Sequence, residues 1–140
     1  MKRVVVIFSL LLSFSLLAFG SEWEGIILAK MLQSMSTNRV VSVYTKDKEL
    51  QKELKNSYIV KIVQTCQKSD FVFVRKDEAD PGCKKPLIVF DYYQYLHTKD
   101  AVAVFFWQKG RPTIRFSQKR LQHFDLKVRG ELSKFVSGND

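Results

Sequence analysis

The chain has 140 residues, a formal net charge of +9 at neutral pH, and a content of 46% hydrophobic and 26% charged residues. This length supports one domain with a single modest core, and it excludes two domains with a catalytic cleft between them. The lysines and arginines are scattered along the chain without a long run of like charge or a basic tail.

The first 20 residues have the layout of a secretory signal peptide. Lys2 and Arg3 form a basic start, and residues 4–19 are almost wholly apolar. This run of about 16 residues is short for a membrane span, which needs about 20. Small residues in Ala18-Phe19-Gly20 predict cleavage before Ser21 and a periplasmic domain over 21–140. An uncleaved N-terminal anchor is the alternative.

Cleavage removes two cations and lowers the net charge from +9 to +7. Outside the cytoplasm this excess indicates an acidic partner, an anionic membrane surface or a cell-wall polymer, and we expect no nucleic-acid partner. The alternative is a basic surface that is only solvated.

The first half of the mature chain alternates helical and strand patterns. Apolar residues at helical spacing predict a helix over 23–36, with a face made of Ile26, Ile27, Met31, Leu32 and Met35. Short β-branched or wholly apolar runs predict strands over 39–44, 58–63, 71–74 and 87–90. Thr45 is expected to cap a helix that carries Leu50 and Leu54, and Asp91 is expected to open a short helix or turn over 92–96.

The C-terminal third predicts a β-hairpin followed by two helices. Strands over 102–107 and 113–116 flank a five-residue loop that contains Gly110. Ser117 is expected to cap a helix through Leu121, and a last helix carries Leu132, Phe135 and Val136. Together these elements predict an α/β fold: one small three-layer domain with a mostly parallel sheet and an antiparallel C-terminal hairpin at one edge.

Cys66 and Cys83 are the two cysteines of the chain. An even count in an exported chain favours a disulfide. Because this bond would close a short loop, it would stabilise the fold by about 3 kcal/mol in the chain-entropy model. If the two following strands are parallel neighbours, both thiols lie just beyond the N-terminal ends of those strands. Two free buried thiols are the alternative. His97 and His123 are isolated, so we expect no metal site.

Motifs for catalysis are absent from the sequence: it has no GxSxG, no P-loop and no GxGxxG. We therefore expect no enzyme and no cofactor. Asp77, Glu78 and Asp80 cluster in one loop, but Pro81 breaks the calcium-loop spacing, so an acidic solvated loop is favoured over a weak cation site.

Two features indicate a binding surface. Aromatic residues are dense over 92–95 and 105–107, and basic residues surround the hairpin loop. Partner contacts are predicted at Trp107, Lys109, Arg111 and Arg115, with Lys119 and Arg120 nearby. The alternative is that helices cover the aromatic rings and water solvates the charges.

The C-terminal third resembles the YfiR-like family of small periplasmic proteins. The similar features are the apolar strand over 102–107, Gly110-Arg111, Arg115-Phe116, Leu126 and the Leu-containing segment 132–135. Cys66 ahead of the apolar run 71–74 is also similar. Ser117 stands where the family has Asn, and the hairpin has two extra residues, including Pro112.

The resemblance implies a periplasmic repressor that binds the extracytoplasmic part of a membrane diguanylate cyclase and responds to redox state. We therefore expect a non-enzymatic regulatory module that docks on an inner-membrane sensor protein, with the disulfide rigidifying the docking site. The alternative is a solute-binding protein that takes a small anion at the C-terminal strand ends, near Thr45, Arg75 and Asp91. A homodimer is left open.

Overall fold

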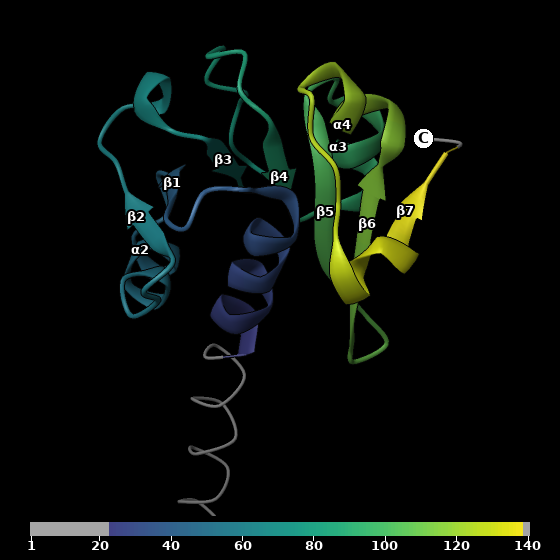
Figure 1. Cartoon of the computed structure of the whole chain (residues 1–140), viewed down its shortest axis with the longest axis horizontal. Coiled ribbons are helices and arrows are strands. Elements are labelled where there is room, and N and C mark those ends of the chain that lie inside the picture. The colour runs from purple at the N-terminus through teal and green to yellow at the C-terminus, as the bar shows by residue number, and fades with distance from the viewer. Residues whose placement is uncertain (1–22, 139–140) are drawn as a thin grey trace, which may run out of the picture.

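The computed structural model describes residues 23–138, which fold around one sheet (Figure 1). Its strands, in chain order, are Val41–Tyr44 (β1), Val60–Ile62 (β2), Phe71–Val74 (β3), Leu87–Val89 (β4), Ala101–Gln108 (β5), Arg111–Ser117 (β6) and Val136–Ser137 (β7). The spatial order is β2-β1-β3-β4-β5-β6-β7. Neighbouring strands are parallel except β5 and β6, which form an antiparallel hairpin. The predicted α/β fold with a mostly parallel sheet is confirmed.

Helices cover both faces of this sheet. Residues 23–35 are helical, and the later helices are Lys48–Leu54 (α2), Tyr92–His97 (α3) and Gln118–His123 (α4). Two 3-10 turns, Cys66–Lys68 (η1) and Gly130–Phe135 (η2), complete the elements. Buried side chains form two clusters, one on each face of the sheet, so the domain has three layers.

The helix over 23–35 packs with α2 on one face. Its buried stripe is Leu28, Met31, Leu32 and Met35, which have the i, i+3, i+4, i+7 spacing of one helix face. Ile26, which we placed on this face from the sequence, is 49% exposed. The prediction was wrong at that residue because Ile26 precedes Leu28 by two positions, which is about half a turn around the helix.

The backbone of Gly25 in this helix faces Glu53 of α2. A Cβ atom at Gly25 would lie 3.4 Å from the Cβ of Glu53, which is van der Waals contact. The two helices are therefore in contact at these residues.

The opposite face of the sheet packs against α3 and the disulfide. Tyr95 of α3 is fully buried against side chains from β3, β4 and β5: Val72, Val74, Leu87, Val89, Ala101 and Val104. Every residue of β3 and β4 is buried, as their uninterrupted apolar sequences predicted.

Three side chains cap the short helices. Asp91 caps α3 by accepting from the Gln94 amide, and Ser117 caps α4 by accepting from the Arg120 amide, as predicted. For α2 the cap is Asp47, whose carboxylate accepts from the amides of Glu49 and Leu50. The prediction of Thr45 was wrong, because the chain turns first: the Thr45 hydroxyl accepts from the Asp47 amide and so positions the true cap.

The C-terminal segment differs from the predicted helix. Leu132 and Phe135 lie in η2, and Val136 begins β7, which pairs in parallel with β6. Thus β7, rather than the hairpin, forms this edge of the sheet. Leu132, Phe135 and Val136 pack against the core cluster, and the pairing of β7 with β6 replaces the end of the predicted helix.

Candidate functional site

The β5–β6 hairpin, which carries the predicted contacts, closes through a two-residue turn. Lys109 and Gly110 have φ values of 51° and 75°, as a type I′ turn requires. Gln108 already pairs with Arg111 across the two strands. The predicted five-residue loop was therefore too long. Lys109 adopts a left-handed conformation that is rare for lysine, so the sequence does not indicate a two-residue turn here.

Trp107 lies near the end of β5 and is 51% exposed. Its ring contacts the buried Phe105 edge-on, with ring centroids 5.8 Å apart. Pro112, directly opposite on β6, is also exposed. The indole is thus supported by the core on one side and keeps a large apolar surface open to solvent, so the core alternative for this residue does not hold.

The hairpin register separates Trp107 from the two arginines. Trp107 pairs with Pro112, whereas Arg111 pairs with Gln108 and Arg115 pairs with Val104. Because successive side chains in a strand point to opposite faces, Arg111 and Arg115 lie on the face opposite to Trp107. The structure therefore does not bring the predicted contact residues onto one face, and only Lys109, at the turn, adjoins both.

Arg115 belongs to an aromatic contact with α3. Its guanidinium donates to the Tyr92 hydroxyl at 3.0 Å and lies over the Tyr92 ring at 5.5 Å. Tyr92 in turn contacts Phe106, with ring centroids 5.7 Å apart. These contacts fix the second face of the hairpin against α3.

Arg120, near the same surface, is occupied by backbone carbonyls. Its guanidinium donates to Tyr95 O at 2.5 Å, Ala101 O at 2.9 Å and Leu96 O at 3.3 Å. It therefore closes the C-terminal end of α3 and joins it to β5, which is a structural role. Lys119, its neighbour, is exposed.

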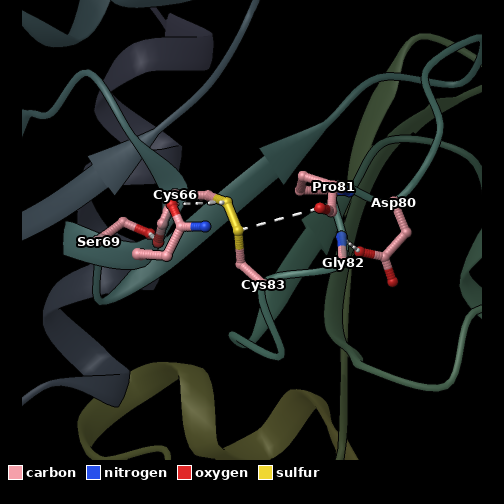
Figure 2. The surroundings of a disulfide bond; sticks show 7 residues. Cys66, Ser69, Asp80, Pro81, Gly82 and Cys83 are labelled. Carbon is pink, nitrogen blue, oxygen red and sulfur yellow. Dashed lines mark hydrogen bonds between the residues drawn. A yellow bond between two sulfur atoms is a disulfide. The ribbon is translucent and has the colours of Figure 1, made fainter.

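The predicted disulfide joins Cys66 and Cys83, with Cα atoms 6.0 Å apart (Figure 2). Two local hydrogen bonds shape the segments around it. The Ser69 hydroxyl donates to Cys66 O at 2.7 Å, and the Gly82 amide donates to the Asp80 carboxylate at 2.8 Å (Figure 2). Gly82 has a φ of 75°, a left-handed value that glycine adopts without steric cost, and the chain bends at Gly82 and Cys83.

The disulfide and the hairpin turn lie at opposite ends of the sheet. Cys66 and Cys83 precede the parallel strands β3 and β4, whereas Lys109 follows β5, which is parallel to β4. The expectation that the disulfide rigidifies a docking site at the hairpin turn is therefore wrong in its geometry. The bond instead holds the N-terminal ends of two central strands.

A charged cluster lies at the C-terminal strand ends, where the sequence placed Arg75 but did not predict its carboxylate partners. Arg75, just after β3, donates to the Asp47 carboxylate at 2.6 Å and to the Glu24 carboxylate at 3.0 Å. Its guanidinium also lies 4.1 Å from the centroid of the Phe90 ring. Only the position of Arg75 after a buried strand signalled this site, since its partners come from two separate helices.

The cluster shifts three pKa values. Burial raises the pKa of Asp47, but hydrogen bonds from Arg75 and from the backbone outweigh it and hold that pKa below its usual range. Burial would lower the pKa of Arg75, but its bonds to Asp47 and Glu24 raise it overall. Burial and the neighbouring Glu24 raise the pKa of Glu53, whose Oε2 atom is buried without a hydrogen-bond partner.

This pairing gives little support to an anion site at the C-terminal strand ends. Arg75 is already neutralised by two carboxylates, and Asp91 is engaged as the cap of α3. Thr45 is buried, with its hydroxyl accepting from the Asp47 amide. An incoming anion would have to displace an existing ion pair.

Searches against protein-family models and curated proteins match nothing to this chain. Among residues 23–138, no group of three or more His, Cys, Asp or Glu side chains could hold a metal ion. Within the same residues, no helix is long and apolar enough to cross a membrane. The predicted signal peptide over 1–20 lies outside the described residues.

Proposed function

We propose that this protein is a periplasmic, non-enzymatic regulatory module that docks on the extracytoplasmic part of an inner-membrane sensor protein. Its likeness to the YfiR-like family over the C-terminal third suggests a diguanylate cyclase as the class of partner. The signal-peptide pattern and the disulfide support an oxidising compartment.

The observation that carries the proposal is the exposed indole of Trp107, held in place by the buried Phe105. Tryptophan is enriched among residues that dominate binding energy, and a side chain that is already ordered loses little entropy on binding. The contact surface therefore centres on Trp107, Pro112 and the Lys109 turn. Arg111 and Arg115 would contribute only to a partner that wraps both faces of the hairpin.

The test measures binding of the mature protein to the purified periplasmic domain of a membrane diguanylate cyclase from the same organism. Truncating an interface anchor costs about 2 kcal/mol or more, so Trp107→Ala should weaken binding at least about tenfold. Because the indole is half exposed, the melting temperature should stay nearly unchanged.

Tyr58→Ala is the matched control, since Tyr58 is 98% exposed beside β2 at the other edge of the sheet. It should leave binding intact. Equal losses in both variants, or unfolding of Trp107→Ala, would contradict the docking role of Trp107. Absence of binding by the unmodified protein would count against a cyclase partner.

A further inference from the structure

A basic pocket of about 590 Å³ lies at the end of the sheet opposite the hairpin turn. Its walls come from three segments: the loop after helix 23–35, the residues that lead into β3 and β4, and the loop after α4. Each wall therefore adjoins the N-terminal ends of parallel strands. The volume is in the range of small-molecule sites, which span about 300–1,000 Å³.

The pocket combines an apolar lining with four cations. Met35, Phe71 and Pro86 are buried and form its floor, while Phe124 and Leu126 are partly exposed and supply apolar surface. Lys84, Lys85, Lys127 and Arg129 supply positive charge. Within residues 23–138, none of these four cations forms an ion pair with a carboxylate. This contrasts with Arg75, where two carboxylates already occupy the guanidinium.

Two carboxylates also line the pocket, and both belong in the charge balance. Asp70 accepts a hydrogen bond from the Ser42 amide at 2.9 Å, so its charge is partly satisfied by the backbone. Asp125 is exposed at the rim. With four cations against two carboxylates, the pocket carries a net charge of +2.

The backbone of one pocket wall is held in an unusual conformation. Lys84 has a φ of 55°, a left-handed value that non-glycine residues adopt at a cost of about 1 kcal/mol or more. Asp125 has the same φ because it ends α4: its amide donates to Gln122 O and the Leu126 amide donates to Leu121 O, as in a Schellman motif. In residues 23–138 the other non-glycine residue with positive φ is Lys109, where the hairpin turn demands it. Strain of this kind concentrates where a chain is shaped around a ligand.

The disulfide supports the same wall. Cys83 immediately precedes Lys84, and its bond to Cys66 tethers this segment to η1. The cations at Lys84 and Lys85 are therefore attached to a cross-linked backbone, which lowers the ordering cost of binding.

We propose that this pocket binds a small organic anion, with a carboxylate or phosphate group against the cations and an apolar body against Phe124 and Leu126. The site is separate from the hairpin and from the Arg75 cluster. Because it can be measured on the purified protein alone, its failure and the failure of the docking role are distinguishable.

The test compares three probes by calorimetry: phenyl phosphate, inorganic phosphate and benzyl alcohol. Phenyl phosphate carries both the charge and the apolar body, so it should bind saturably with a dissociation constant in the low-millimolar range or tighter. Inorganic phosphate lacks the body and benzyl alcohol lacks the charge, and each should bind at least about tenfold more weakly. Absence of saturable phenyl phosphate binding up to roughly 20 mM overturns the proposal.

Charge-matched variants locate the site. Lys85→Gln and Arg129→Gln should each weaken phenyl phosphate binding about fivefold or more, whereas Lys119→Gln, the same charge change on α4 outside the pocket, should not. An equal effect of Lys119→Gln overturns the proposal, because general surface charge would then explain binding. Amide NMR shifts should concentrate at residues 84–85 and 125–129; shifts centred on Arg75 also overturn it.

Discussion

Arg75 and Phe90 are stacked at the C-terminal ends of two neighbouring strands, with the guanidinium carbon 4.1 Å from the ring centroid. The ring covers one face of the guanidinium, while its N–H groups bind Asp47 and Glu24 in the plane. One side chain thereby joins β3 and β4 to the N-terminus of α2 and to helix 23–35. Glu53 interacts electrostatically with the charges of this cluster, and its Oε2 atom is buried without a hydrogen-bond partner.

Glu53→Gln is expected to raise the free energy of unfolding at pH 7. The folded protein raises the pKa of Glu53 above its reference value of 4.5, so the protonated form is the one that folding favours. This stabilisation is complete below about pH 4.5 and is lost as the pH rises through the folded pKa. The variant should therefore lose that part of the pH dependence in urea unfolding measured between pH 4 and pH 7.

The control is Glu131→Gln, which makes the same charge change at an exposed residue of η2, away from Glu53. It should leave the profile unchanged above pH 4.5. In both variants Asp47 still loses its stabilising charge as the pH falls below 3.8, so stability should decline there. A Glu53→Gln protein that is less stable than the unmodified one at pH 7 would show that this carboxylate stabilises the cluster.

Cys83→Ser is expected to lower the free energy of unfolding by about 2 to 4 kcal/mol, because it opens the covalent loop around β3. The measurement is urea unfolding of the oxidised protein and of the variant. Titration of the denatured, unreduced protein should find no free thiol. Two titratable thiols in freshly isolated protein would contradict the bond.

Arg120→Lys is expected to lower stability by about 1 to 3 kcal/mol. A lysine ammonium cannot reproduce the two guanidinium nitrogens that donate to the carbonyls of Tyr95, Leu96 and Ala101. A buried carbonyl left without a donor lowers stability. Thermal unfolding compares this variant with Lys119→Gln, an exposed neighbour that should be nearly neutral. Equal stability of Arg120→Lys and the unmodified protein would argue against the capping role.

Export predicts that the protein recovered from the periplasmic fraction starts at Ser21. The small residues of Ala18-Phe19-Gly20 fit the cleavage specificity, and N-terminal sequencing reads the outcome directly. Met1 found intact in the membrane fraction would instead establish the uncleaved anchor.

The central strands were predictable from sequence because their burial is complete. Phe71–Val74 is fully apolar and forms β3 with the predicted bounds, and Leu87–Val89 falls one residue short of its prediction. The two cysteines were predictable as a pair for a related reason: each lies a few residues before one of these neighbouring parallel strands. Local pattern and tertiary arrangement agree at these positions.

Features set by long-range contacts were not predictable. The Lys109 turn depends on a backbone conformation that lysine rarely adopts, and β7 forms only because β6 offers an open edge. The Arg75 cluster draws its carboxylates from positions 28 and 51 residues away in the chain. Trp107 and Arg111 were grouped by nearness in sequence, yet strand alternation places them on opposite faces.

The exposure of Trp107 also determines what the tryptophan fluorescence of this protein can measure. The chain has two tryptophans, and the other, Trp23, is 46% exposed in helix 23–35. Both indoles are already exposed to solvent, so their emission should change little on unfolding and is a weak measure of core integrity. Binding of a partner to the hairpin should instead remove water from Trp107 and shift its emission to shorter wavelength. Replacing Trp23 by Phe would make the remaining fluorophore a direct optical sensor of the hairpin surface.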